Sequence, residues 1–203
     1  MAVKFPKKVR VSCFDYDIIY PYRFKEAEDR VAQHSYYNLE IRISPESPLR
    51  ERRRDSKIVV SLIHELIHAI DYCYNFNTLE EEQVESLANV LFEFFTKNFN
   101  GKKWDVRDKL DILGHKYSIE LGTEFEEIDD AASFAENNSC VICLASSINK
   151  PSMQRAYLLY HVFVILNRLV SIGIDESIID RLAFAFIDTM DRNNLWKFFA
   201  VKG

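Results

Sequence analysis

Residues 64–68 read His-Glu-Leu-Ile-His, and this short segment carries the strongest chemical signal in the chain. Two histidines four positions apart project from one face of a helix, so both imidazoles can reach a single ion. A glutamate between them can act as general base on the water that a zinc ion activates. The residue types and their spacing therefore predict a zinc site of the hydrolase type, with His64 and His68 as ligands and Glu65 as the catalytic base.

The helix expected to hold this motif, residues 57–75, is apolar over most of its circumference. Burying such a helix is costly unless its polar groups find partners, and one metal ion would satisfy both histidines at once. The competing interpretation is an exposed helix face that happens to carry two histidines. The polar groups form a single seam of Ser61, His64, Glu65, His68, Asp71 and Asn75.

A catalytic zinc site usually has three protein ligands and a water, so a third ligand is needed. The next helix is expected to start at Thr78, because Thr78-Leu-Glu-Glu81 fits a capping box that occupies Glu81. Glu85 borders the apolar stripe of that helix and is the preferred ligand, whereas Glu82 points further outward. Glu81 and Glu82 stay open as alternatives. The whole acidic cluster also fits a solvated first turn favoured by the helix dipole.

Asp71 shares the histidine face, seven positions after His64. That spacing is about 10 Å along a straight helix, too far for a short aspartate to reach an ion between the histidines. We expect Asp71 either to hydrogen-bond an imidazole from behind the ligands or to cap the end of the helix.

The segment His64-Glu-Leu-Ile-His-Ala-Ile-Asp71, followed by Glu82-Gln-Val-Glu-Ser-Leu-Ala-Asn89, resembles the small gluzincin-like metallopeptidases of bacteria and phages, the SprT-like and ImmA/IrrE-like proteins. The resemblance covers residues 8–98, and the glutamate segment matches more loosely than the histidine motif. It implies a small sheet before the motif helix, His64 and His68 as ligands, Glu65 as base and Glu85 as third ligand. It also implies that an extended substrate lies beside the strand Leu39–Ile43.

The chain also reads as two copies of one unit. A shift of 101 positions brings Lys8 onto Lys109, and near the end of each copy a shift of 95 brings Leu87 onto Leu182. Both copies show the same order of two strands followed by two helices, which favours duplication over chance. The expected fold is α+β: a zincin-like unit of small sheet, histidine-motif helix and glutamate helix, duplicated in tandem as an internal pseudo-dimer. Residues 1–100 form the first unit and residues 101–203 the second. Further matched pairs are Tyr16 with Tyr117, Ile18 with Ile119, Ile41 with Ile142, and Lys97-Asn98 with Arg192-Asn193.

The second copy lacks the zinc ligands. Val164, which stands at the place of His68, cannot bind zinc, so only the first unit is expected to hold metal. The degenerate copy suits a scaffold or a surface that binds a protein partner. We expect the two units to pack through apolar faces, because about 95 residues alone bury a limited core. Candidates for that contact are Phe94, Phe95, Phe184 and Phe186. The other aligned positions are Tyr160 for His64, His161 for Glu65, Asn167 for Asp71 and Asp180 for Glu85.

The net charge, the apolar segments and the cysteines of the chain bear on its class of function and its location. A net charge of −5 gives no reason to expect nucleic-acid binding. The start of the chain has no apolar signal-peptide core, and no apolar run approaches the ~18–20 residues of a membrane span. Four cysteines without a secretion signal indicate reduced thiols in the cytoplasm, or the host cytoplasm for a phage protein.

We expect a zinc-dependent metallopeptidase that hydrolyses an intracellular protein or peptide substrate. The alternative is a non-catalytic protein-binding or regulatory protein that keeps a zincin fold and a zinc site.

Overall fold

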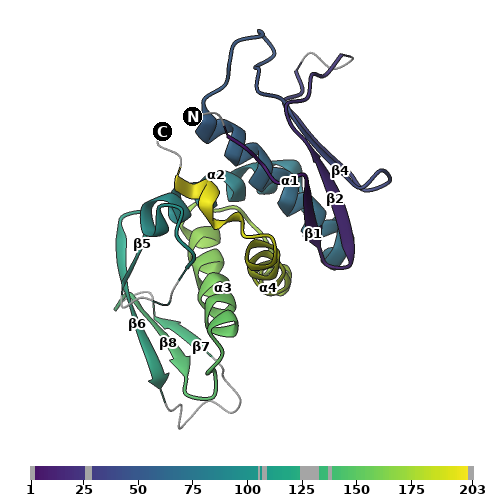
Figure 1. Cartoon of the computed structure of the whole chain (residues 1–203). Helices are drawn as coiled ribbons and strands as arrows, with labels where there is room; N and C mark the ends of the chain where they lie inside the picture. Colours follow the sequence, from purple (N-terminus) through teal and green to yellow (C-terminus); the bar gives the residue numbers. More distant parts are fainter. Residues whose placement is uncertain are drawn as a thin grey trace.

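The chain forms two four-stranded sheets, and each sheet is followed in sequence by two helices (Figure 1). The computed structural model describes residues 3–25, 29–104, 106, 109–123, 133–136 and 139–200. In the first unit the elements are β1 (Lys8–Val11), β2 (Phe14–Ile19), β3 (Ala32–Ser35), β4 (Glu40–Ile43), α1 (Asp55–Asn75) and α2 (Glu81–Phe99). In the second they are β5 (Lys109–Ile112), β6 (His115–Thr123), β7 (Ser133–Glu136), β8 (Val141–Ala145), α3 (Pro151–Leu169), α4 (Glu176–Arg192) and the 3-10 helix η1 (Leu195–Ala200).

Both sheets have the same topology. The strand order is β1-β2-β4-β3 in the first and β5-β6-β8-β7 in the second. In each sheet the first two strands form an antiparallel hairpin, the second pairs in parallel with the fourth, and the third pairs antiparallel to the fourth. The sheets are therefore mixed, and the edge strands of the first are β1 and β3.

The pairing registers confirm the duplication. Lys8 pairs with Asp17 in the first sheet, and the residues 101 positions later, Lys109 and Ser118, pair in the second. Ala32 opposite Ile43 is likewise repeated as Ser133 opposite Leu144. The helices repeat at shorter spacings, since α3 begins 96 residues after α1 and α4 begins 95 residues after α2. The α+β class and the tandem duplication expected from the sequence are both present.

The strands follow the alternation that their residues dictate. In β1, Val9 and Val11 are buried while Lys8 and Arg10 are exposed, as a strand with one face against a core requires. The buried face of the first sheet packs on α1, which contacts β1, β3 and β4. This packing fixes the motif helix against the sheet, with β3 lying along it.

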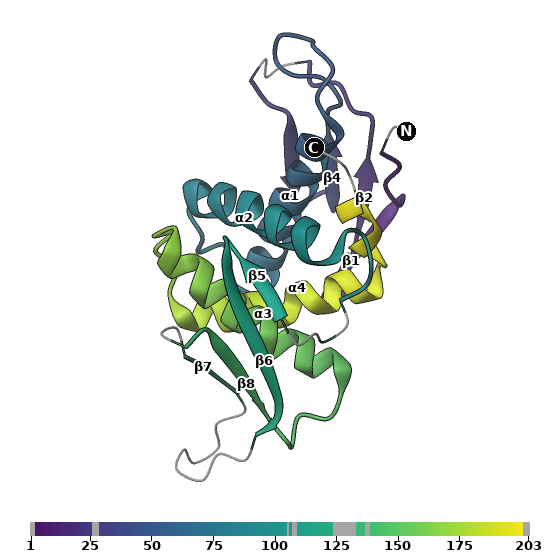
Figure 2. The same ribbon diagram turned by 90° about the vertical axis from the view of Figure 1, so that its left-hand side faces the viewer.

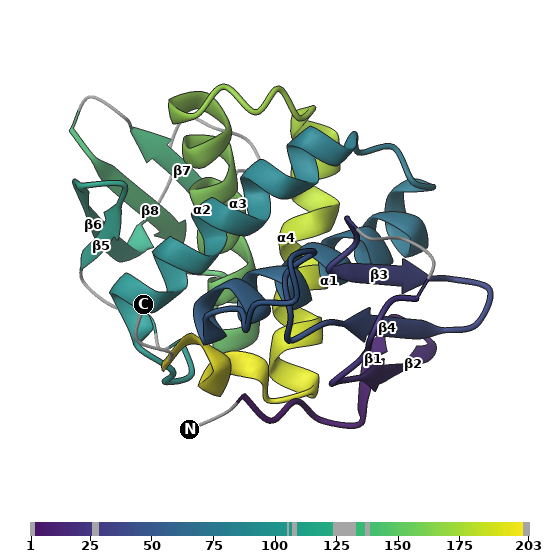
Figure 3. The same cartoon turned by 90° about the horizontal axis from the view of Figure 1, so that it is seen from above.

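The two units share one apolar core. The helices lie between the two sheets, which face outward on opposite sides (Figures 1 and 3). Phe95 and Phe186, two of the four expected contact residues, stack across the units with ring centroids 5.9 Å apart. Phe94 is buried but contacts rings near its own helix end and Trp104, and Phe184 packs on Tyr157 within the second unit. Apolar packing between the units is thus confirmed for Phe95 and Phe186, and Phe94 also contacts Trp104 of the second unit.

None of the helices in the described part of the chain combines the length and the apolar character needed to cross a bilayer.

Candidate metal centre

The two histidines of the motif converge on one point from successive turns of α1. The helix runs without proline or glycine, and its apolar residues, among them Ile63 and Ile67, are buried in the core. That packing leaves His64 and His68 half-buried on the opposite seam. Their Nε2 atoms lie 3.0 Å apart. The spacing of four residues therefore does bring both imidazoles to a common site.

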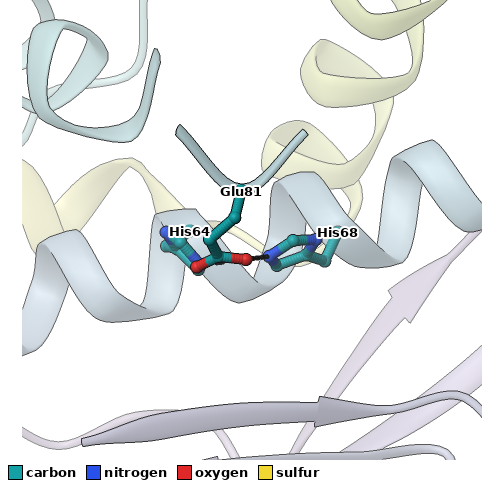
Figure 4. Close-up of side chains that lie close together, drawn as sticks. All are labelled: His64, His68 and Glu81. Atoms are coloured by element: carbon teal, nitrogen blue, oxygen red, sulfur yellow. Dashed lines mark hydrogen bonds and ion pairs between the residues drawn. The ribbon is translucent and has the colours of Figure 1, made fainter. Parts of the chain in front are cut away.

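A carboxylate from α2 completes the cluster. Glu81 Oε1 lies 3.0 Å from His64 Nε2, and Glu81 Oε2 lies 3.1 Å from His68 Nε2 (Figure 4). Among the described residues, these three side chains are the one group of histidine, cysteine and acidic residues close enough to share an ion. Two imidazoles and one carboxylate on two helices form a possible metal-binding triad.

The donor set fits zinc. Ligands at 2.0–2.1 Å from a tetrahedral ion lie about 3.3 Å from one another, which is close to the separations of the three side chains here. Zinc binds neutral imidazole, and burial together with the neighbouring His68 lowers the pKa of His64 against the opposing influence of Glu81. His64 is therefore in its metal-binding form at neutral pH.

Glu65 lies beside the triad and is almost fully buried, with 5% of its surface exposed. Burial, with a smaller contribution from Glu81, raises the pKa of its carboxyl to about 8. A backbone hydrogen bond from His34 and the charge of Arg30 act in the opposite direction. Without a cation nearby the carboxyl is mostly protonated at neutral pH, and a cation at the triad would favour its ionised form.

The carboxylate at the histidines belongs to Glu81, whereas the sequence favoured Glu85. The sequence argument placed the helix start at Thr78 and gave Glu81 a capping role. In the structure the N-cap is Glu80, and the capping box joins Glu80 and Gln83. Glu81 is thus the first residue of α2, and its side chain is free to reach the histidines. Glu85 lines the same cleft one turn further on, and its charge raises the pKa of His64.

Asp71 does not hydrogen-bond an imidazole in this structure. Its carboxylate accepts hydrogen bonds from the backbone N–H of Leu79 at 2.9 Å and from the Thr78 hydroxyl at 3.3 Å. It therefore holds the loop between α1 and α2, a role different from both the imidazole contact and the cap at the end of α1 that the sequence suggested. Asn167 of the second unit has the same role, because its Oδ1 accepts from the Ile174 N–H at 2.9 Å.

The other polar residues of the seam make hydrogen bonds away from the triad, although the buried Nδ2 of Asn75 has no partner among the described residues. Ser61 Oγ accepts a hydrogen bond from Arg53 at 2.6 Å. Asn75 Oδ1 accepts one from Arg181 of the second unit, also at 2.6 Å. Both residues are structural, so the chemistry of the seam is confined to the triad and Glu65.

The triad opens into a cleft of about 880 Å³ between β3, α1 and the first turns of α2. Every residue from Asp29 to His34 lines the cleft, as do His64, Glu65 and His68. The expected substrate strand, Leu39–Ile43, is not available to a substrate: β4 lies between β2 and β3 and is paired on both sides. The edge that faces the cleft is β3, a correction that follows from the strand order.

The second unit does not rebuild the triad. Val164, in the place of His68, is buried, and Glu176, in the place of Glu81, pairs with Arg168 at 2.9 Å. His161 is buried with its Nε2 2.8 Å from Ser133 Oγ, and burial lowers its pKa to about 4. This histidine is a packed residue in a neutral state.

Sequence reasoning missed two groups at the site. His34, on β3, has its Nε2 buried without a hydrogen-bond partner among the described residues, and burial together with His68 lowers its pKa to about 4. Arg30 lines the cleft and acts on the charge of Glu65. Both come from the segment before β4, and no spacing in the sequence links that segment to the histidine motif.

Comparison of the chain with family models, with curated proteins and with solved structures gives no match, so the chemistry of the site follows from its own geometry.

Proposed function

We propose that the protein is a zinc-dependent peptidase in which His64, His68 and Glu81 hold the metal and Glu65 is the general base. One observation carries the proposal. Two imidazole Nε2 atoms and one carboxylate meet at 3.0–3.1 Å, and a buried glutamate opens into the same cleft. This arrangement supports the zincin-like identity that the sequence motif suggested.

A zinc ion and Glu65 would have different roles in the hydrolysis of a peptide bond. A zinc ion held at the triad would polarise the carbonyl of the scissile bond and lower the pKa of water. Glu65 takes a proton from the attacking water and delivers it to the leaving amine, which requires the ionised carboxylate at the start of the cycle. The cation favours that ionised form, so loading the site increases the fraction of Glu65 that can act as a base at neutral pH.

The edge strand β3 can bind an extended substrate. Its other side is paired with β4, and its residues line the cleft beside Glu65. An added strand gains main-chain hydrogen bonds whatever its sequence, and its side chains then enter the cleft. A peptide bond lying along β3 would pass the triad.

The experiment compares wild type with Glu65→Gln on a labelled, unfolded casein. The variant should keep zinc and thermal stability but lose hydrolysis, because Glu65 is not a ligand. Glu93→Gln, an exposed glutamate on α2, is the matched control and should remain active. Equal activity of Glu65→Gln and wild type, or zinc loss in Glu65→Gln, would contradict the assigned role.

A non-catalytic binding protein is the second candidate, and the second unit favours it. That unit repeats the sheet register and the Asn167 contact but not the triad. If wild type holds zinc, cleaves nothing, and Glu65→Gln keeps the biological effect, binding replaces hydrolysis as the function.

A further inference from the structure

The cleft has a long axis, and the catalytic residues occupy its middle. At one end Arg53, just before α1, donates a hydrogen bond to the Val31 carbonyl. In the middle His34 bonds Glu65 through its backbone. Beyond it, the side chain of Tyr36 stacks on Tyr72 one turn after His68, with ring centroids 4.5 Å apart. The segment 31–36 and α1 therefore run side by side in the same direction.

One end of the cleft is basic. Of the described residues that line it, Arg30, Arg53 and Lys57 are basic and Asp29 is acidic. Arg53 donates to the carbonyls of Val31 and Ser44 and to the side chain of Ser61, none of which cancels its charge. Arg30 and Lys57 are exposed, and neither forms an ion pair within the described part of the chain. Among the described residues, this end of the cleft therefore carries more basic than acidic side chains.

The other end is aromatic. Tyr36 lines the cleft, stacks on Tyr72 and also contacts Tyr37, whose ring is tilted and has its centroid 4.0 Å away. Tyr37 is 84% exposed, while Tyr36 and Tyr72 are 37% and 36% exposed. Stacked tyrosines offer a rigid flat surface for another aromatic or large apolar side chain, at little cost in entropy.

We propose that the cleft selects peptides with acidic side chains on one side of the cleaved bond and an aromatic or large apolar side chain on the other. This substrate class rests on the peptidase function proposed above. Lys57 lies seven residues before His64, about 10 Å along α1, which an extended peptide covers in about three residues. Tyr72 lies four residues after His68, about 6 Å and about two residues of extended peptide. Adding the about 6 Å between His64 and His68 gives about 22 Å from Lys57 to Tyr72, so the acidic and aromatic side chains are about seven residues apart.

Binding is measured with the zinc-loaded Glu65→Gln protein, so that no substrate is consumed. The probes are fluorescein-labelled ten-residue peptides with two aspartates and one phenylalanine at this spacing, made in both chain orders. Matched peptides replace the aspartates with lysine or the phenylalanine with serine. One chain order of the parent peptide should bind, and each replacement should raise Kd about tenfold. Added salt should weaken the aspartate effect and leave the phenylalanine effect unchanged.

Substitutions in the protein test which end of the cleft recognises the acidic side chains and which recognises the aromatic one. Lys57→Glu should remove the preference for aspartate over lysine, and Tyr36→Ala should remove the preference for phenylalanine over serine. Lys150→Glu and Phe134→Ala, exposed positions of the second unit, are the controls and should change neither. Equal Kd values for all peptides, or equal effects of the variants and their controls, would overturn the selectivity. Selective binding without cleavage by wild type would instead overturn the peptidase function alone.

Discussion

Asn98 and Asn193 make the same pair of hydrogen bonds, each to the first strand of the other unit. Asn98 Nδ2 donates to the Asp111 carbonyl and its Oδ1 accepts from the Asp111 N–H, both at 2.8 Å. Asn193 does the same with Arg10, at 2.9 Å and 2.8 Å. Asp111 is the position of Arg10 shifted by 101 residues, and Asn193 is the position of Asn98 shifted by 95. The end of α2 thus meets β5 as the end of α4 meets β1 (Figure 2).

Such a reciprocal exchange is the pattern of a two-fold symmetric interface, in which residue i contacts j and its counterpart contacts the counterpart of j. The two units belong to one chain, but through this exchange they pack on each other as the subunits of a symmetric dimer do. Each asparagine satisfies a backbone N–H and a carbonyl on an edge strand, where the sheet itself supplies no partner.

Replacing either asparagine should therefore destabilise the whole protein. Asn98→Ala and Asn193→Ala each remove two hydrogen bonds to the backbone of the other unit, which should lower the free energy of unfolding by about 1–3 kcal/mol. The measurement is urea denaturation followed by circular dichroism. Asn89→Ala is the control, because Asn89 is exposed and bonds only a carbonyl of its own helix, and it should cost much less. Equal costs at all three positions would contradict the role of the reciprocal contacts.

The duplication was predictable because it depends on strand register. A strand of fixed length tolerates no insertion without turning its buried face outward, so Lys8, Tyr16 and Ile41 keep one constant shift to their counterparts. Helices and loops tolerate changes of length, and the shift drops there to 96 and 95. The motif residues His64 and His68 were equally predictable, since both lie on one rigid helix.

The third carboxylate was not predictable from spacing. Glu81, Glu82 and Glu85 share the first turns of one helix, and the choice depends on where that helix begins. Thr78 is a common capping residue, but Asp71 uses the Thr78 hydroxyl and Leu79 N–H, and the helix starts after Glu80. The expectation that an extended substrate lies beside Leu39–Ile43 was wrong for a similar reason. Alternation shows that β4 is buried on one face, but strand order is a property of the whole sheet.

The position of Glu81 gives a test of the ligand set. Wild type should bind about one zinc per chain, and His68→Ala should abolish tight binding, as one of three protein ligands is lost. Glu81→Gln should weaken zinc affinity at least about tenfold, and Glu85→Gln much less, because only Glu81 lies at the histidines. Competition with a chromogenic chelator measures each Kd. A larger loss of zinc affinity in Glu85→Gln than in Glu81→Gln would instead support Glu85 as the third ligand, as the sequence predicted.

Zinc binding should release a proton from Glu65. The pKa of Glu65 is raised to about 8 without metal, so at pH 7 the carboxyl is mostly protonated, and the cation should drive that proton off. Calorimetric titrations of zinc in buffers of different ionisation enthalpy count the protons. Wild type should release about one more than Glu65→Gln at pH 7. At pH 9 Glu65 is already ionised, and the difference should vanish. The same count for both proteins at pH 7 would show that Glu65 is ionised before metal binds.

The buried histidine of the second unit should make the protein sensitive to acid. His161 has a pKa of about 4 in the folded protein, against about 6.5 for an unfolded chain. Between these values the unfolded chain takes up a proton that the folded protein does not, so the free energy of unfolding falls as pH falls from 6.5 towards 4. From pH 7 to pH 5 the loss due to His161 should be about 2 kcal/mol.

His161→Gln keeps a donor near Ser133 without titrating, and should reduce the loss by that amount. Some dependence will remain, because the pKa of His34 is lowered as well. His115→Gln, at an exposed position on β6, is the control and should behave as wild type. If urea denaturation at the two pH values gives the same loss for wild type and His161→Gln, the buried imidazole does not set the acid sensitivity.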